Sequence, residues 1–274
     1  MKYLSLLFIS LFSLGLSAQT TIGLELYSFR NQIPKDVPGM LATISKMGIR
    51  EIEGGGSYGL PMNEYKQLLD KNKLKMISIA ADFGKLQTDL PAIINEAKAL
   101  GASYVVCFWI PHNGDEFTMN EVNKAIEVFN TAGKKLKESG LNFCYHPHGY
   151  EFRPYESGTL FDQLIKNANP KYVNFEMDVF WIKHPGQDPV ALLKKYPNRF
   201  VLMHLKDRKP GTEGNHFGRA DVESNVVLGS GDVGIADIMK IAKKQGVKHF
   251  FIEDESSRSL EQVPQSLAYL KSLK

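Results

Sequence analysis

Four segments of this 274-residue chain end an apolar run with side chains that bind metals or transfer protons. They are NFCYHPH (142–148), VNFEMD (173–178), FVLMHLKD (200–207) and FFIEDE (250–255). Metal sites and acid–base sites need several such groups converging from different segments. A barrel of parallel strands provides this, because every strand ends on the same face. The candidate residues at these ends are His146, Asp178, His204 and Glu253.

Each of these positions has a second interpretation. His148 lies two residues beyond His146 and faces the same side of an extended strand, so either imidazole is a candidate ligand, with His146 preferred. Asp178 also suits a cap for the following turn, although an unpaired carboxylate after a buried strand is costly. Lys206 shares a strand face with His204, and a lysine buried there needs a partner such as a substrate oxygen or a carboxylate.

Further candidates lie near other predicted strand ends. Glu151 follows the HPH segment and Glu53 closes an earlier strand, and each is either a functional acid or a member of a surface ion pair. Tyr27, Trp109 and Trp181 stand where aromatic rings either stack on sugar faces or pack at the rim of the fold.

A recurring boundary organises the chain around these ends. KMGIREIE (46–53), ALGASYVV (99–106), ESGLNFCY (138–145) and KQGVKHFF (244–251) each join the end of a helical segment, a glycine and a β-rich run. Glycine suits the left-handed residue that ends a helix, and Val, Ile, Phe and Tyr suit a buried parallel strand. Strands are therefore predicted near residues 22–28, 50–54, 75–81, 103–109, 142–147, 173–178, 200–205 and 248–253.

Amphipathic segments separate the predicted strands. PGMLATISKM, MNEYKQLLDKN, LPAIINEAKAL and MNEVNKAIEVFNTAGKKLKES place apolar residues near helical spacing. Eight strands alternating with eight helices, within the length of one domain, predict an α/β fold of the (β/α)8 TIM barrel type over residues 19–274. An open, doubly wound sheet is the alternative.

The motif GSGDVG points toward that alternative. Gly229, Gly231 and Gly234 fit the pattern G-x-G-x-x-G between a strand-like and a helix-like run, and Asp254 follows about 20 residues later, as in a dinucleotide site. A dinucleotide-binding half needs several βα units after the glycine loop, whereas one strand and one helix remain here. We therefore interpret the motif as a tight barrel loop that brings backbone near a substrate.

Residues 1–18 have the features of a secretory signal peptide. Lys2 gives a positive start, LSLLFISLFSLGL is an apolar core, and Ser17 and Ala18 are small residues before a cleavage point at Gln19. A transmembrane anchor is the alternative, but a span needs ~20 apolar residues and this run is shorter. We expect a periplasmic or secreted protein without a membrane anchor. The net charge of +3 gives no support for nucleic acid as a partner.

Five motifs together resemble a known family. HPHGYEF, the aspartate that closes NFEMD, HLKDR, the G-x-G-D-V loop and FIEDE fall in the order seen in sugar phosphate isomerase/epimerase-like barrels. These belong to the xylose isomerase-like superfamily, which also includes endonuclease IV and inosose dehydratase. IGLELYSFRN and IREIEGG resemble the family's first two strands, so the resemblance covers essentially the whole chain after residue 18.

The resemblance implies one divalent metal ion at the barrel mouth, held by His146, Asp178, His204 and Glu253. Two imidazoles and two carboxylates suit Mn, Co, Zn or Fe better than Ca, which prefers oxygen ligands alone. Many sugar epimerases of the family carry glutamate at the fifth-strand position, where it serves as one of two opposed bases. His146 stands there in this chain. The sequence thus resembles the inosose dehydratase branch and argues against a two-carboxylate epimerisation.

Metal-assisted enolisation is the chemistry that such a site implies. A divalent cation stabilises the enediolate that forms when a base removes the proton next to a ketone. Reprotonation makes the enzyme an isomerase or epimerase, whereas expulsion of water or an aglycone from a 3-keto-sugar makes it a dehydratase or lyase. Because export separates the protein from cytoplasmic sugar phosphates, we expect an unphosphorylated keto-sugar or keto-glycoside as substrate.

The expected roles follow from this chemistry. Glu253 is the expected metal-linked base, with Glu151 and His148 as further acid–base candidates and Lys206 on a substrate oxygen. Substrate contacts are expected from Tyr27, Glu53, Trp109, Trp181 and Lys206.

Two other classes of protein share some of these features. A non-catalytic carbohydrate-binding barrel would keep the aromatic residues without the metal. A DNA repair enzyme like endonuclease IV calls for a basic face and a histidine three residues after Asp178, where this chain has Trp181. A homo-oligomer is compatible with the sequence.

Overall fold

Eight parallel strands form a closed barrel in the computed structural model, which describes residues 21–273. In chain order they are β1 (Ile22–Glu25), β2 (Glu51–Gly54), β3 (Lys75–Ala80), β4 (Tyr104–Cys107), β5 (Asn142–Tyr145), β8 (Val173–Asp178), β9 (Phe200–Leu205) and β12 (His249–Ile252). The first strand pairs with both β2 and β12, and this closes the barrel. The predicted (β/α)8 TIM barrel is confirmed, and the doubly wound sheet is excluded.

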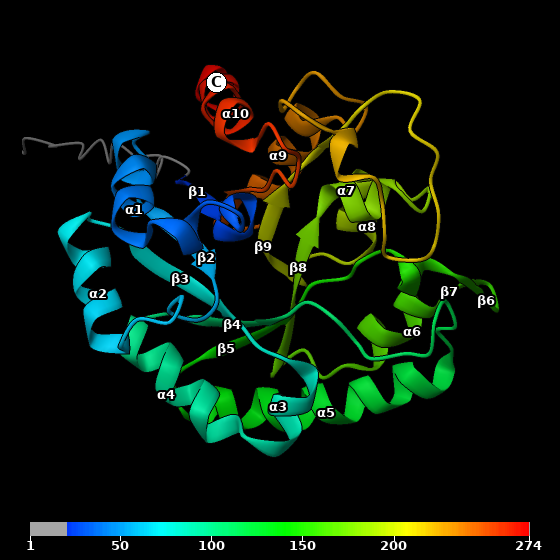
Figure 1. Ribbon diagram of the computed structural model, residues 1–274. Helices are drawn as coiled ribbons and strands as arrows, with labels where there is room; N and C mark the ends of the chain where they lie inside the picture. Colours follow the sequence, from blue (N-terminus) through cyan, green and yellow to red (C-terminus); the bar gives the residue numbers. More distant parts are fainter. Residues whose placement is uncertain (1–20, 274) are drawn as a thin grey trace, which may run out of the picture.

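Helices surround the strands (Figure 1). They are α1 (Val37–Lys46), α2 (Met62–Lys71), α3 (Phe83–Thr88), α4 (Leu90–Leu100), α5 (Met119–Glu138), α6 (Leu160–Asn167), α7 (Val179–Lys183), α8 (Pro189–Lys195), α9 (Ile235–Lys244) and α10 (Ser259–Ser272). The described chain thus has ten α-helices where eight were predicted, because two connections are divided. Between α3 and α4, Asp89 caps the second helix by accepting a hydrogen bond from Ala92 N, and Pro91 follows in its first turn.

Short elements decorate the C-terminal face of the barrel. A hairpin of β6 (Pro154–Tyr155) and β7 (Gly158–Thr159) follows β5, and a pair formed by β10 (Asp207–Arg208) and β11 (Asn225–Val226) follows β9. Single 3-10 turns are η1 (Leu26–Phe29), η2 (Ile33–Lys35), η3 (Tyr150–Phe152) and η4 (Val222–Ser224).

The glycine boundary that repeats in the sequence ends four helices. The four glycines have φ between +73° and +89°, the left-handed conformation that glycine adopts without a Cβ clash. They are Gly48, Gly101, Gly140 and Gly246.

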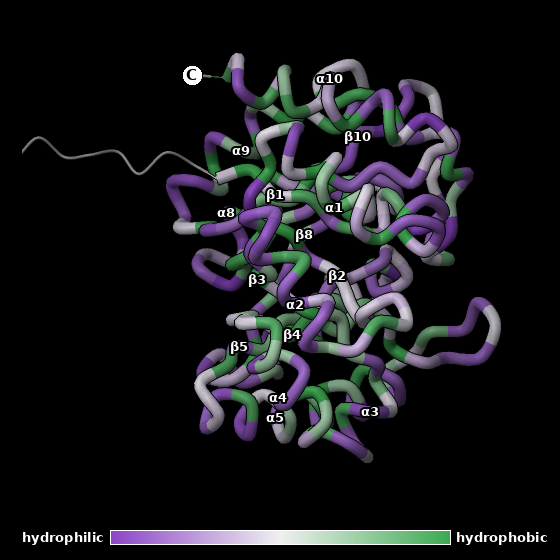
Figure 2. Tube along the Cα trace, turned by 60° about the vertical axis from the view of Figure 1, so that its left-hand side comes forward, coloured by the Kyte–Doolittle hydropathy of each residue, from purple (hydrophilic) through white to green (hydrophobic). Residues whose placement is uncertain are grey.

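The apolar side chains form two layers. A small cluster drawn from alternate positions of the strands lies inside the barrel and includes Val106, Cys144, Leu202 and Phe251. A much larger cluster packs the outer faces of the strands against the helices. In Figure 2 hydrophobic and hydrophilic positions alternate along the outer helices, as expected for helices that bury one face. Cys107 and Cys144 are both buried free thiols, one in each layer.

The predicted signal peptide, residues 1–18, lies outside the described residues. Within residues 21–273 the helices are all too short or too polar to cross a bilayer.

Candidate metal centre and active site

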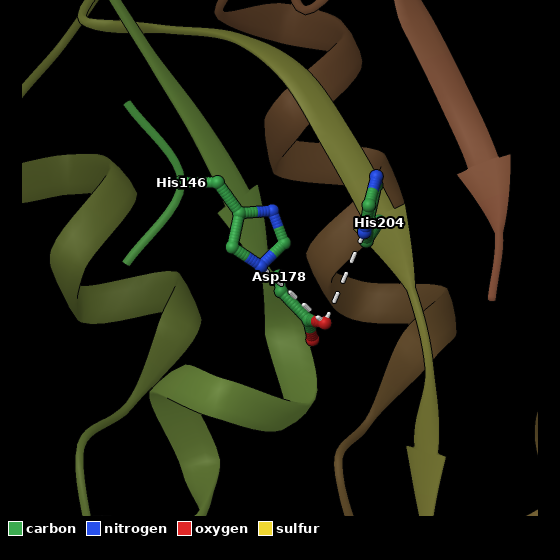
Figure 3. Close-up of side chains that lie close together, drawn as sticks. All are labelled: His146, Asp178 and His204. Carbon is green, nitrogen blue, oxygen red and sulfur yellow. Dashed lines mark ion pairs between the residues drawn. The ribbon is translucent and has the colours of Figure 1, made fainter. Parts of the chain in front are cut away.

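Side chains from three strand ends converge at the C-terminal mouth of the barrel. His146 follows β5, Asp178 ends β8 and His204 lies near the end of β9 (Figure 3). All three are buried, and each offers one ligand atom within 4.8 Å of the others. The β8–β9 register pairs Asp178 directly with His204. The barrel therefore brings three of the four predicted metal ligands into one group.

His146 presents one ring nitrogen to this group. Its Nδ1 lies 3.2 Å from Oε2 of Glu176, while its Nε2 lies 3.9 Å from Oδ2 of Asp178 and has no hydrogen-bond partner within residues 21–273. Burial lowers the pKa of His146 well below its ordinary value, so the imidazole is neutral. A neutral imidazole whose other nitrogen faces a carboxylate is the usual form of a metal-bound histidine.

Asp178 uses its two oxygens differently. Oδ1 accepts hydrogen bonds from the backbone N–H groups of Phe180 at 2.8 Å and Trp181 at 3.2 Å, which caps α7. Oδ2 has no partner in the described part of the chain, and burial raises the pKa of Asp178 to about 7. The capping interpretation and the ligand interpretation are therefore compatible, because each uses a separate oxygen.

His204 lies between carboxylates on both sides of its ring. Nδ1 is 2.9 Å from Oε2 of Glu253 and 4.0 Å from Oδ2 of Asp178, and Nε2 is 2.5 Å from Oε1 of Glu53. Ser78 Oγ donates a hydrogen bond to the other oxygen of Glu53. Although burial opposes protonation, the neighbouring carboxylates raise the pKa of His204 well above its ordinary value. In this arrangement Glu53 orients the ring that faces Asp178.

Glu253 lies beside the three-residue group and connects it to Lys206. The Lys206 Nζ is 3.5 Å from Oε1 of Glu253, contacts Glu255, and lies 5.4 Å from the ring centre of Trp181. Although burial acts in the opposite direction, Lys206 and His204 hold the pKa of Glu253 well below its usual range. A carboxylate held so firmly in its charged form suits a metal ligand better than a strong base.

Two acidic residues of the site were not singled out from the sequence. Glu25 ends β1, and Glu176 precedes Asp178 by two residues on the same face of β8; both are buried. Burial raises the pKa of each well above its ordinary value. The two-residue strand period was the available signal for Glu176, because it places that side chain on the same face as Asp178.

Glu151 lies behind the site rather than in it. The turn at Gly149 (φ +99°) folds the chain back, and the fully buried carboxylate accepts hydrogen bonds from Tyr145 Oη and from the backbone N–H of His148 at 3.2 Å. Burial raises the pKa of Glu151 to about 7. These contacts stabilise the loop that carries His148, and they place Glu151 outside the lining of the cleft described next.

A cleft of about 710 Å³ opens above the convergent group. Five residues predicted to contact substrate or transfer protons line it, together with the predicted metal ligands His146 and His204. The five are Tyr27, Trp109, Trp181, His148 and Glu253. His148 Nδ1 has no hydrogen-bond partner among the described residues, and burial lowers the pKa of His148 to about 4. Glu53 and Lys206 are buried beneath the cleft lining.

The donor set fits a divalent transition-metal ion. Buried polar atoms normally have hydrogen-bond partners. His146 Nε2 and Asp178 Oδ2 face each other without one among the described residues, and both are atoms that can bind a metal ion. Imidazole and carboxylate donors together suit Zn, Mn, Co or Fe. His146, Asp178, His204 and Glu253 are the residues that would hold the ion, with Glu53 and Glu176 behind the two histidines.

The GSGDVG loop has a structural explanation. Backbone N–H groups of Gly229 and Gly231 donate hydrogen bonds to Oδ2 of Asp207 at 2.8 and 3.0 Å, and Val233 N donates to Oδ1. A Cβ on Gly231 would lie 2.2 Å from Oδ1 of Asp207, so glycine is required for this close approach. The carboxylate of Asp207 therefore accepts hydrogen bonds from the backbone N–H groups that would bind a phosphate in a dinucleotide site.

The chain belongs to the xylose isomerase-like TIM barrel family, whose model matches residues 41–273. This confirms the family resemblance predicted from the sequence. In a 95-residue region the chain is 32% identical to inosose dehydratase 1 of Bacillus cereus, a region that covers 35% of this chain and 31% of that relative. The matched region thus spans about a third of the length of this curated relative.

Solved structures share the whole fold. A sugar phosphate isomerase/epimerase from Parabacteroides distasonis ATCC 8503 is 26% identical, with a TM-score of 0.78 over 95% of this chain and 97% of that chain. The IOLI protein, solved with a bound zinc atom, has a TM-score of 0.73 at 12% identity and covers 92% of this chain and 97% of that one. At that identity the second likeness shows the fold alone.

Proposed function

We propose that this protein is a metal-dependent enzyme that removes the proton next to the ketone of an unphosphorylated keto-sugar or keto-glycoside. The observation that carries the proposal is a pair of buried metal-ligand atoms without hydrogen-bond partners among the described residues: His146 Nε2, on a residue that lines a large cleft, and Asp178 Oδ2, buried next to it. The similarity to an inosose dehydratase and to a sugar phosphate isomerase/epimerase supports a carbohydrate substrate. A bound divalent cation would act there as a Lewis acid toward the substrate ketone.

Few basic side chains are available in the cleft to bind a phosphate group. Of the described residues that line it, only Arg30 and Lys85 are arginine or lysine, and Arg30 already donates hydrogen bonds to the carbonyl oxygens of Tyr27 and Glu255. This shortage of donors supports a substrate without phosphate.

The protein's own side chains divide the remaining work. His148 lines the cleft with an unpaired Nδ1, which places it where a proton can be moved to or from the substrate. Glu253 carries its negative charge against His204, and Lys206 fixes the other oxygen of that carboxylate. Trp181, which is buried, and Trp109, which is partly exposed, present aromatic rings to the cleft on which a sugar can pack.

Elimination is the second candidate outcome of the same first step. Reprotonation of the enediolate gives an isomerase or epimerase, whereas loss of a β-substituent gives a dehydratase or lyase. Inosose dehydratases among the relatives favour elimination, and the sugar phosphate isomerase/epimerase likeness favours reprotonation.

The experiment that separates these outcomes uses deuterium oxide. The protein, loaded with Zn or Mn, is incubated with keto-sugars and 3-keto-glycosides, and products are followed by NMR. Deuterium at the carbon next to the ketone identifies an isomerase or epimerase, and release of water or an aglycone identifies a lyase. Absence of exchange and of turnover across the panel, in protein shown to bind metal, would contradict the proposal. A protein that binds these sugars but no metal would be a carbohydrate-binding barrel.

We also propose that the protein acts outside the cytoplasm. The argument is the signal-like composition of residues 1–18, and it agrees with a substrate that carries no phosphate.

A further inference from the structure

Trp109 is an exposed aromatic ring held in a fixed position. Its side chain is 40% exposed and lines the cleft. The ring stacks on His112 with centroids 4.9 Å apart and meets the edge of Tyr150 at 4.7 Å. The His112 ring is itself anchored by a 2.7 Å contact between Nδ1 and the carbonyl oxygen of Ile110. A flat ring that is held in place by its neighbours and opens into the cleft offers a surface on which a sugar or an aromatic ring can stack.

The loop of residues 209–221 packs its backbone against the same ring. Gly218 has φ +68° and lines the cleft, and a Cβ added there would lie 2.8 Å from Tyr150 and 3.1 Å from Trp109. This loop follows β10 and is drawn in yellow and orange in Figure 1. Its end is tied down by Arg219, which pairs with Asp115 at 2.5 Å.

Trp109 lies outward from the metal-binding group. The ring centroids of His146 and His148 are 4.7 Å apart, and those of His148 and Trp109 are 5.8 Å apart. The three rings therefore lead from the floor of the cleft to its rim. A sugar ring whose ketone lies beside His146 would project its next ring toward Trp109.

We propose that Trp109 and the Gly218 loop form an outer subsite for the group attached to the reacting sugar, so that the preferred substrate is a keto-glycoside rather than a free keto-monosaccharide. This inference rests on the proposed function. The subsite would recognise a flat apolar ring face that is joined to the reacting sugar through a glycosidic bond. Either a second sugar or an aromatic aglycone has such a face.

Tryptophan fluorescence can report on this subsite directly. The chain has two tryptophans, Trp109 and Trp181, so in the Trp181→Phe variant all tryptophan emission comes from Trp109. We expect 3-keto-cellobiose and phenyl 3-keto-glucoside to change this emission at concentrations where 3-keto-glucose does not. Response to one of the two glycosides alone identifies the attached group as a sugar or an aromatic ring. The outer subsite would be contradicted if all three probes changed the emission equally, or if none of them changed it.

Matched variants test the same inference through substrate preference. Trp109→Ala should lower the ratio of kcat/KM for glycoside over free keto-sugar by about tenfold, the size expected for one lost ring contact. Phe217→Ala, at an exposed ring on the same loop that lines a different groove, should leave that ratio unchanged.

Substitutions at two glycines of the loop distinguish the effect of a side-chain collision from the effect of backbone strain. Gly218→Ala should also lower the preference, because its Cβ would collide with Trp109 and Tyr150. Gly211→Ala has the same left-handed strain, with φ +82°, but its Cβ would have nothing within 4 Å, so the preference should remain. If the wild type and all four variants turn over substrate with the same preference for glycoside over free keto-sugar, the subsite is refuted and the proposed function remains. Absence of any turnover refutes the proposed function.

Discussion

The Nε2 atom of His146 lies 3.9 Å from Oδ2 of Asp178, and both atoms lack a hydrogen-bond partner within residues 21–273. Asp178→Asn keeps an oxygen to cap α7 but replaces the free oxygen with an N–H donor. We therefore expect this variant to fold and to lose the metal ion. Elemental analysis should find about one divalent ion per wild-type chain and far less in Asp178→Asn. Retention of the full metal content would exclude Asp178 as a ligand.

The carboxylates behind the histidines should influence metal affinity without touching the ion. Glu176→Gln and Glu53→Gln each replace a carboxyl group that faces His146 or His204 with an amide, and such outer partners typically contribute about 10–100-fold in affinity. Competition with a chelator measures the change. The matched control is Glu51→Gln, which breaks a 2.8 Å carboxylate–imidazole pair with His249 at the opposite end of the barrel. Equal weakening in the control would indicate a general loss of stability.

Glu253 and Lys206 should differ in their effects on activity and metal content. Glu253→Gln removes a charged ligand, so metal affinity should weaken and turnover should fall by about 10²-fold or more, because a bound cation supplies several kcal/mol of transition-state stabilisation. Lys206→Met should chiefly lower kcat, because it removes the positive charge that holds Glu253 in position, and it should leave the metal bound. Metal content and turnover are measured on the same samples. Full activity in Glu253→Gln would contradict the enolisation mechanism.

The barrel was predictable because short stretches of sequence are enough to recognise its strands. Gly48 and Gly101, for example, end helices, and the apolar run that follows each of them is a strand. The helix predicted at LPAIINEAKAL is α4. The short helix α3, which has six residues and is capped by Asp82, was missed between β3 and α4.

The site was less predictable because it depends on closure of the barrel. His204 and Glu53 are 151 residues apart in sequence and meet only when β1 and β2 close against β12 and β9. Glu176 was overlooked, although the strand period places it on the same face as Asp178, because its partner His146 lies 30 residues away in sequence. Glu151 was placed beside the substrate because the turn at Gly149, which folds the carboxylate away from the cleft, cannot be recognised from the residues alone.

Export should be visible at the N-terminus of the protein. If residues 1–18 are a signal peptide, the exported protein begins at Gln19. Expression with the native N-terminus, fractionation of the cells and mass spectrometry of the intact protein give the answer. Finding Met1 to Ala18 on soluble cellular protein would contradict export and remove one argument against phosphorylated substrates.

The stability of the fold should carry a pH dependence that originates at Glu151. Burial raises the pKa of this carboxyl from 4.5 to about 7 in the native state. Between these values the native state binds more protons than the unfolded state, so stability falls as pH rises and is lowest above pH 7. The shift corresponds to roughly 3 kcal/mol.

Glu151→Gln should remove this contribution, because an amide does not titrate while its oxygen still accepts from Tyr145 and from His148 N. Urea midpoints between pH 5 and pH 8 should fall more steeply in the wild type than in the variant, so the variant gains relative stability as pH rises. Glu127→Gln, at an exposed position on α5, should follow the wild-type curve. A constant difference between wild type and Glu151→Gln across this range would show that the buried carboxyl does not titrate there. Metal-free protein is used throughout, so that proton release from the metal ligands does not enter the comparison.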